Sequence, residues 1–257
     1  MSLTAINLTA GYGRHAVVAE VNATLPEGST TVLIGANGSG KSTLLRTLTG
    51  AQAALAGRVE LDGREINAYK PGQLARKLSL VLTDRTGGGG LRVDELVGIG
   101  RHPYSGFLGR MSAADREAVE RAICLVGLGH KSAEFVASLS DGERQKAMIA
   151  RALAQSTELM VLDEPTSFLD VAARFEITDL LSMLSREEGK TILLSTHDTA
   201  AALAAADNVW ALCDGRVYAG SVDELREGGV LDRVYPGMRY DAAAKDFRRM
   251  LNVEGQA

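Results

Sequence analysis

Several features are scarce or missing in this sequence, and each absence argues against a class of protein. There are only two cysteines, Cys124 and Cys213, far apart and outside any CxxC pair, so we expect reduced thiols rather than a disulfide framework or a zinc site. No run approaches the roughly 20 apolar residues that cross a bilayer, and we expect no secretory signal because the chain starts without a basic and apolar leader. There is no long Lys/Arg block and the net charge is −4, so binding to nucleic acid is not expected.

What is present indicates one α/β unit. The 257 residues, 46% hydrophobic and 23% charged, permit one large domain with a substantial core. Asp62-Gly63 and Asp214-Gly215 are typical of tight hairpin turns. After Asp223 the pattern weakens and predicts only short helices. Short apolar runs predict strands at 30–34, 78–82, 159–162 and 191–195, and helical patterns cover 42–48, 93–100, 112–126, 143–153, 171–184 and 199–206.

A glycine-rich segment between a predicted strand and a predicted helix carries the strongest chemical signal. It reads Gly35-Ala36-Asn37-Gly38-Ser39-Gly40-Lys41-Ser42-Thr43 and fits the pattern of a phosphate-binding P-loop. Glycines let main-chain N–H groups converge on phosphate oxygens, and the helix N-terminus adds partial positive charge. Lys41 can reach the β- and γ-phosphates, and the Ser42 hydroxyl can ligate Mg²⁺. The alternative, a glycine-rich turn without function, does not explain the strand and helix on either side.

A second motif fits the same chemistry. The apolar strand 159–162 ends in Asp163-Glu164, and strand C-termini are where α/β sheets bind ligands. Asp163 can hold Mg²⁺, through water, and Glu164 can orient and polarise an attacking water. A solvated strand end is the usual explanation for such a pair taken alone, so its value depends on the P-loop upstream.

Further motifs resemble those of the ABC (ATP-binding cassette) ATPases. Leu139-Ser140-Asp141-Gly142-Glu143-Arg144-Gln145 is similar to the family's LSGGQ signature, and Ser167-Phe168-Leu169-Asp170 resembles its D-loop. His197 resembles the switch histidine, and Tyr12 stands where the family places an aromatic that stacks on adenine. The match covers about residues 3–223, in the family's order and spacing. Without the other motifs, His197 would read as a partly exposed loop histidine and Tyr12 as a turn aromatic.

The resemblance implies a fold and a mechanism. The fold is an α/β P-loop NTPase (RecA-like) core at 1–84 and 156–223, with an antiparallel β subdomain, a helical signature subdomain at 85–155 and a C-terminal extension at 224–257. Two copies would dimerise head to tail, with each ATP between the P-loop of one copy (Asn37, Gly38, Ser39, Gly40, Lys41, Ser42, Thr43) and the signature of the other (Ser140, Gly142, Glu143). Glu164, His197 and Lys41 would be catalytic, and Asp170 would link the two sites.

Two departures from the family pattern lead to specific expectations. Asp141 replaces the usual glycine. A carboxylate about 4 Å from a γ-phosphate would cost roughly 4 kcal/mol per unit charge, so we expect Asp141 to cap its own helix and face away from ATP. The Q-loop glutamine is replaced by Thr83-Asp84. We expect Thr83 to reach Mg²⁺ through a water with help from Asp84, the alternative being a plain loop.

The segment after this loop indicates the kind of transporter. Val93-Asp94-Glu95-Leu96-Val97 and Gly100-Arg101-His102-Pro103-Tyr104 resemble the ATPases of importers for iron-siderophore complexes, haem or cobalamin. The resemblance implies integral membrane permease subunits, a periplasmic or extracellular substrate-binding protein, and a place on the cytoplasmic face of the membrane. The alternatives are an exporter subunit or a non-transport ABC ATPase acting in DNA repair or translation. The second usually has tandem cassettes, zinc cysteines or basic arms, which this chain lacks.

Overall fold

The computed structural model describes residues 1–82, 90–105 and 110–250. Its centre is a six-stranded sheet in the order β10-β9-β3-β8-β7-β6, with β10 antiparallel to β9 and the other pairings parallel. The strands are β3 (Thr30–Gly35), β6 (Leu78–Val81), β7 (Leu159–Asp163), β8 (Thr191–Ser195), β9 (Asn208–Cys213) and β10 (Arg216–Gly220). A predominantly parallel sheet of this kind requires crossover helices, which confirms the α/β class.

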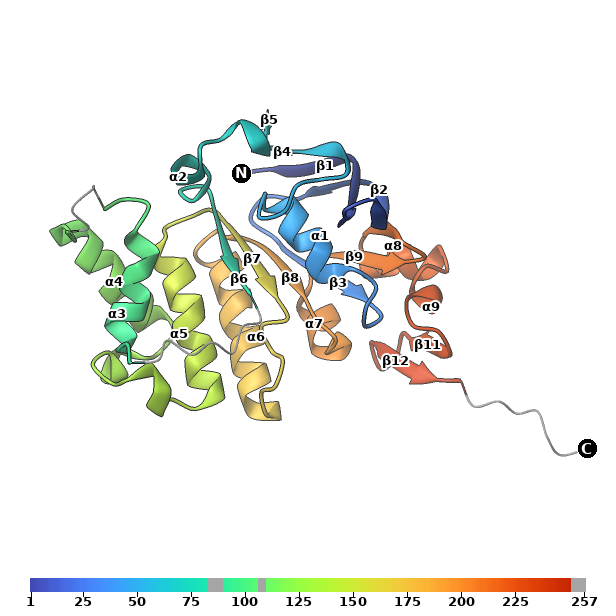
Figure 1. Ribbon diagram of the computed structural model, residues 1–257. Helices are drawn as coiled ribbons and strands as arrows, with labels where there is room; N and C mark the ends of the chain where they lie inside the picture. Colours follow the sequence, from blue (N-terminus) through green and yellow to red (C-terminus); the bar gives the residue numbers. More distant parts are fainter. Residues whose placement is uncertain (83–89, 106–109, 251–257) are drawn as a thin grey trace, which may run out of the picture.

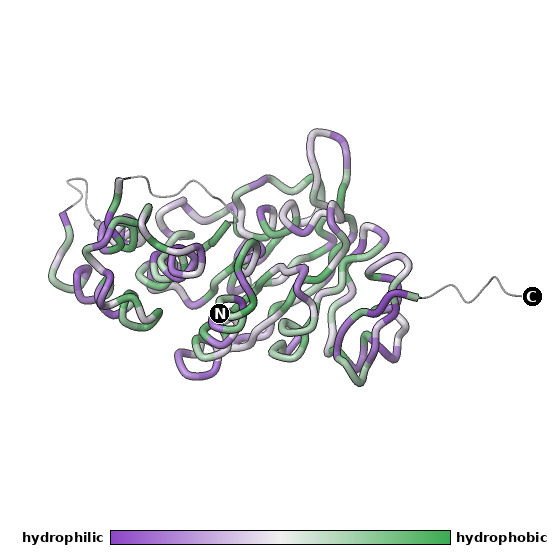
Figure 2. The backbone as a smooth tube through the Cα atoms, turned by 90° about the horizontal axis from the view of Figure 1, so that it is seen from below, coloured by the Kyte–Doolittle hydropathy of each residue, from purple (hydrophilic) through white to green (hydrophobic). Residues whose placement is uncertain are grey.

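Both faces of this sheet are covered, as continuous apolar strands require. On β3, Val32 and Ile34 belong to one buried cluster and Leu33 to the other. The first cluster includes residues of α5 (Asp141–Ala154), α6 (Val171–Arg186) and α7 (Thr199–Ala205), and the second includes residues of α1 (Lys41–Leu48). Figure 2 shows the hydrophobic segments gathered in the central strands and the hydrophilic ones outside them.

A second, antiparallel sheet lies over α1 (Figure 1). Its order is β2-β1-β4-β5, from β1 (Leu3–Tyr12), β2 (His15–Leu25), β4 (Ala56–Leu61) and β5 (Arg64–Glu65). The β4–β5 turn is formed by Asp62 and Gly63, at φ 53° and 72°, the left-handed pair that a tight hairpin needs. After it come the short helices η1 (Ile66–Ala68) and α2 (Pro71–Leu74).

A group of helices at one end of the molecule precedes β7 in the chain (Figure 1). It contains α3 (Val93–Gly98), η2 (Ile99–Arg101), α4 (Ala113–Leu125), η3 (Gly129–Lys131), η4 (Val136–Ser138) and α5. Ser112 caps α4 together with Asp115. All these helices fall inside residues 85–155, although the exact domain limits at 84, 155 and 223 stay a prediction.

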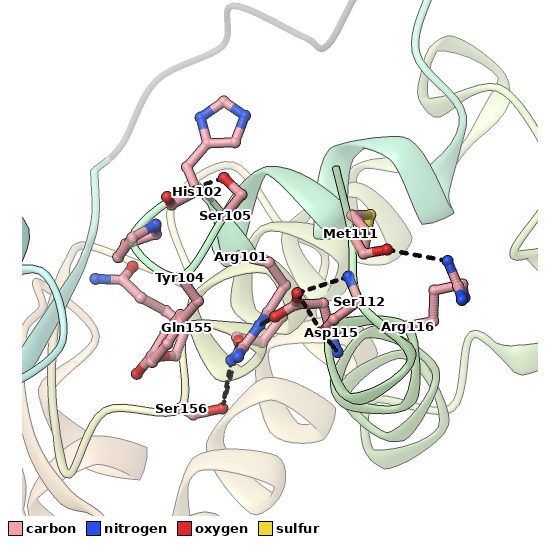
Figure 3. A network of polar contacts seen from close by, with 12 residues as sticks. Arg101, His102, Tyr104, Ser105, Met111, Ser112, Asp115, Arg116, Gln155 and Ser156 are labelled. Atoms are coloured by element: carbon pink, nitrogen blue, oxygen red, sulfur yellow. Dashed lines mark hydrogen bonds and ion pairs between the residues drawn. The ribbon is translucent and has the colours of Figure 1, made fainter. Parts of the chain in front are cut away.

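A buried ion pair holds this group together (Figure 3). Arg101 Nε donates to Asp115 Oδ1 over 2.9 Å, and Arg101 Nη1 donates to the Ala154 carbonyl over 2.7 Å and to Ser156 Oγ over 2.9 Å. The Ser112 hydroxyl and amide, and then the guanidinium, hold the pKa of Asp115 at about 2. Arg101 therefore links η2 to α4 and to the end of α5, and its role here is structural.

The C-terminal extension lies at the opposite end of the molecule (Figure 1). It contains α8 (Val222–Glu227), α9 (Leu231–Val234) and a hairpin of β11 (Met238–Asp241) and β12 (Asp246–Arg249). The expectation of short helices alone was therefore wrong. Most hairpin residues are charged or small, so strands of four residues show no clear alternation of polar and apolar side chains. The hairpin depends instead on the packing of Phe247, whose side chain is 7% exposed.

Candidate nucleotide-binding site

The P-loop joins β3 to α1 in a conformation that requires glycine. Gly38 and Gly40 have φ values of 76° and 107°, a region that other residues rarely adopt. A Cβ on Gly40 would lie 2.5 Å from Val17 Cγ1, and a Cβ on Gly35 would lie 2.8 Å from Ser39 Oγ. The loop thus folds its main chain closely upon itself, as a cradle of N–H groups for phosphate must.

Lys41 is held inside this loop. Its Nζ donates to the carbonyls of Gly35, over 2.9 Å, and Ala36, over 3.4 Å, and lies 4.0 Å from Glu164 Oε1. Burial lowers the pKa of Lys41, while the charges of Glu164 and Asp163 oppose that effect. The ammonium group is therefore positioned at the loop, where it can exchange weak carbonyl contacts for phosphate oxygens.

Other residues of the loop fit a polyphosphate. Ser39 Oγ is buried and has no hydrogen-bond partner among the described residues, and such a group is costly unless a ligand satisfies it. Asn37 and Gly38 are exposed at the tip, and Ser42 is half-buried at the start of α1. Thr43 Oγ1 donates to Tyr12 Oη over 3.2 Å. The Tyr12 side chain, 54% exposed, thus lies beside the loop with area free for a base.

The end of β7 brings the second motif to the same region. Asp163 is paired in register with Ser195 at the end of β8. Ser195 Oγ donates to Asp163 Oδ1 over 2.7 Å and accepts from the Glu164 amide over 2.9 Å. Ser195 was missed by sequence reasoning. Its position at the polar end of a buried strand was the only available signal, since its partner lies 32 residues away.

Glu164 is the meeting point of the predicted catalytic residues. One carboxylate oxygen accepts from Ser167 Oγ over 2.8 Å and lies 3.4 Å from His197 Nδ1, while the other faces Lys41 Nζ. Its backbone has φ 48°, a conformation that is uncommon for a residue with a side chain. The structure therefore brings Lys41, Glu164 and His197 together, although they are separated by more than 150 residues.

The signature residues form the start of α5. Ser140 is the N-cap: its Oγ accepts from the Glu143 amide over 3.3 Å, and the Glu143 carboxylate accepts from the Ser140 amide over 3.0 Å. Glu143 also contacts Lys131 Nζ at 2.8 Å. The Lys131 contact, followed by the Ser140 amide, holds the pKa of Glu143 at about 2.

Asp141 was expected to cap α5, and this was wrong. Asp141 is the first residue of the helix, one position after the cap, and its Oδ1 accepts from Arg144 Nη1 over 2.9 Å. The N-cap position belongs to Ser140 because serine accepts from the amide three residues on, while Glu143 completes the reciprocal bond. α5 consequently begins at Asp141, two residues earlier than predicted.

Asp170 lies at the start of α6, near the signature. Its Oδ1 accepts from the Ala173 amide over 2.8 Å, and a Cβ on Gly142 would lie only 3.0 Å from Ala173 Cβ. The signature and the D-loop helix are therefore in close contact. α5 lies in the helical group, apart from α1 and the P-loop (Figure 1).

The predicted Mg²⁺ ligands are only partly described. Thr83 and Asp84 lie outside the described residues. Within the described ranges, no group of three or more His, Cys, Asp or Glu side chains could hold a metal. The Ser42 hydroxyl and the Asp163 carboxylate are oxygen ligands of the kind that Mg²⁺ prefers, and Mg²⁺ usually completes its shell with substrate phosphates and waters. The donor set fits a metal that arrives with a nucleotide.

A strand, a glycine loop with a lysine, a helix and a second strand that ends in an acid define a P-loop nucleotide-binding protein. The family model described as ABC transporter matches residues 18–167. The chain belongs to the ABC transporter family, as an ATP-binding cassette. Among the residues that the structure describes, no helix has the length and apolar character needed to cross a membrane.

Individual relatives point to one branch of that family. The chain is 40% identical to the ferric enterobactin transport ATP-binding protein FepC of Escherichia coli (strain K12) over 233 residues, which are 90% of this chain and 86% of that protein. It is 41% identical to a siderophore transport system ATP-binding protein, YusV, of Bacillus subtilis (strain 168), over 91% of this chain and 87% of that protein.

Solved structures confirm the fold. A protein described as a metal-chelate type ABC transporter, in an inward-facing conformation, aligns with a TM-score of 0.81 and 25% identity over 96% of this chain and 95% of that chain. A dimeric ATP-binding cassette in a post-hydrolysis state with ADP and Pi aligns with a TM-score of 0.73 and 27% identity over 86% of this chain and 98% of that chain.

Proposed function

We propose that this chain is the ATP-hydrolysing subunit of an importer for iron-siderophore or related metal-chelate complexes. The observation that carries the proposal is the convergence of Lys41, Glu164 and His197 beside the P-loop. These residues come from a helix start, a strand end and a loop. Folding alone does not require that their side chains lie close together. The relatives named for enterobactin and siderophore transport support the choice of cargo, which never contacts this subunit.

The proposed chemistry assigns a task to each residue of the site. Lys41 and the P-loop amides bind the phosphates, and Tyr12 stacks on the adenine. Ser42 and Asp163, together with Thr83, would hold Mg²⁺, which would supply charge neutralisation at the phosphate oxygens. Glu164 accepts a hydrogen bond from the attacking water and polarises it. The Ser167 hydroxyl and His197 fix the orientation of that carboxylate, and His197 also contacts the γ-phosphate.

A second copy of the chain completes the site. Ser140 and the amides of Gly142 and Glu143, at a helix N-terminus, would receive the γ-phosphate that the facing P-loop holds. The Glu143 carboxylate contacts Ser140 and Lys131. It therefore stabilises the start of α5 and does not contact the phosphate. Asp170, which caps the neighbouring helix, would link the two sites across the dimer.

A groove in the helical group is the proposed contact with the permease. It has a volume of about 600 Å³ between α3, α4 and η3, with the exposed Ile99 in its wall. Three acids, Asp94, Glu95 and Glu120, line it, together with Arg116 and with Arg101, which is paired with Asp115. Cytoplasmic loops of membrane proteins are rich in Lys and Arg, so a basic permease loop with an apolar residue for Ile99 suits this groove. The chain would thus act on the cytoplasmic face, and the substrate-binding protein on the other side.

The experiment is reconstitution. The full chain would be co-expressed with a polytopic permease, purified as a complex and placed in proteoliposomes with a substrate-binding protein and a ferric siderophore. We expect Glu164→Gln to bind ATP but to lose at least about 100-fold of turnover, as removal of a general base does. Glu187→Gln, on the exposed end of α6, is the matched control. A wild-type complex that neither binds nor cleaves ATP, or a chain that binds no permease, would contradict the proposal.

A further inference from the structure

The C-terminal hairpin is attached to the loop that carries His197. Asp246, the first residue of β12, accepts a hydrogen bond through Oδ1 from Thr199 Oγ1 over 2.7 Å and another from the Phe247 amide over 2.8 Å. Thr199 is the first residue of α7, is only 8% exposed, and follows His197 by two positions. β12 and α7 lie side by side. The extension therefore contacts the site from outside the ATP-binding motifs.

The hairpin is itself fixed to the core. Phe247 packs edge-on against Tyr235, with ring centroids 4.7 Å apart, and against Tyr240, at 5.4 Å. The Tyr235 hydroxyl is buried and makes no full hydrogen bond among the described residues. Burial raises the pKa of Tyr235 to about 12, although the nearby amide of Gly35 partly opposes this. Phe247 belongs to the large buried cluster of the core, and Tyr235 and Tyr240 pack against that cluster, so Asp246 belongs to a packed body.

The residue between His197 and Thr199 has a second attachment. Asp198 Oδ2 lies 3.5 Å from Arg174 Nη1 of α6, and the Asp198 amide donates to Thr196 Oγ1 over 3.0 Å. Asp198 occupies the N-cap position of α7 but makes no side-chain capping bond. The start of α7 therefore lacks the local support that usually fixes a helix N-terminus, and Thr199 obtains it from Asp246.

We propose that Thr199 and Asp246 are positioning residues for His197, so that the C-terminal extension takes part in ATP hydrolysis. The inference rests on the proposed contact of His197 with the γ-phosphate. The His197 side chain is 44% exposed and lies 3.4 Å from Glu164, so its own packing fixes it only weakly. Its position depends on the backbone that follows it, which Arg174 holds through Asp198 and Asp246 holds through Thr199. A shift of about 1 Å at such a residue can cost roughly 100-fold in rate.

The test compares two substitutions at one position. Thr199→Val keeps the shape and removes the hydroxyl, whereas Thr199→Ser keeps the hydroxyl. In the reconstituted complex we expect Thr199→Val to lower kcat about tenfold, which corresponds to roughly 1.4 kcal/mol of activation free energy. We expect KM for ATP to change less than about twofold. Thr199→Ser should restore kcat. Thr4→Val, which removes a hydroxyl bonded to Thr24 in the antiparallel sheet, is the control and should leave kcat unchanged.

A double mutant separates positioning from general damage. If Thr199 acts through His197, Thr199→Val should lower kcat no further in a His197→Ala background, because residues of one unit are not additive. An equal loss in both backgrounds would overturn the inference. A normal Thr199→Val enzyme beside an impaired His197→Ala enzyme would also overturn it but leave the proposed function intact. Normal turnover of His197→Ala would remove the role of His197, and this inference with it.

Discussion

Replacing Ser195 with alanine tests whether a residue outside the known motifs sets the geometry of Asp163, the acid that we propose holds Mg²⁺. Ser195 is fully buried at the end of β8. Its hydroxyl donates to Asp163 Oδ1 over 2.7 Å and accepts from the Glu164 amide over 2.9 Å. That amide also donates to the Ser195 carbonyl over 3.1 Å, so it keeps a partner in Ser195→Ala. The Asp163 carboxylate loses a charge-assisted bond.

The expected loss of stability follows from this difference between the Asp163 carboxylate and the Glu164 amide. A hydrogen bond to a charged group is worth about 1.5–3 kcal/mol, whereas the amide with a second acceptor loses little. Taking about 2 kcal/mol, the melting temperature should fall by roughly 4–8 °C for a chain of this size. If the same bond also orients Asp163 for Mg²⁺, the apparent affinity for Mg²⁺ should fall up to about 30-fold.

The assay is ATP turnover as a function of Mg²⁺ concentration, together with thermal unfolding without nucleotide. Ser182→Ala is the control, because the Ser182 hydroxyl bonds to a carbonyl of its own helix, that of Thr178. Wild-type dependence on Mg²⁺ in Ser195→Ala, with a melting temperature within about 1 °C of wild type, would refute the reasoning.

Two further predictions concern the helical group. Gly142→Val should lower turnover of the dimer without weakening ATP binding to the single subunit, because its Cβ would lie 3.0 Å from Ala173 Cβ and displace the signature; Gly72→Val, in open space, is the control, and equal loss in both variants would contradict this. Asp115 has a pKa held at about 2 by Ser112 and the buried guanidinium, so its stabilisation is present above its ordinary pKa of 3.8 and is lost as the pH falls toward 2. The difference in melting temperature between wild type and Asp115→Asn should therefore be largest at pH 6 and clearly smaller at pH 3, and a constant difference would count against the ion pair.

Local sequence was sufficient for the features that depend on neighbouring residues. The apolar run at 30–34 predicted the central strand β3, because only a strand buried on both faces carries no polar alternation. Asp62-Gly63 predicted a hairpin turn, because the turn needs two left-handed residues. The P-loop followed from Gly38, Gly40 and Lys41, since phosphate binding depends on main-chain conformation within a few residues.

The same reasoning failed where two local solutions compete or where the signal is short. Asp141 and Ser140 are both good capping residues, and the side-chain bond to Glu143 selects Ser140. The hairpin β11–β12 has four-residue strands, too short for a period to be read. Its formation depends on the packing of Phe247 against Tyr235 and Tyr240.

The sequence by itself determined the family and the α/β class and led to the residues that we propose bind ATP, because each of these is written in a short window of fixed spacing. Only the tertiary structure decided which distant groups meet: Ser195 with Asp163, Arg101 with Asp115, and Thr199 with Asp246. The reason is that strand order and helix packing, which set these contacts, arise from burial summed over the whole chain. No window of neighbouring residues contains that sum.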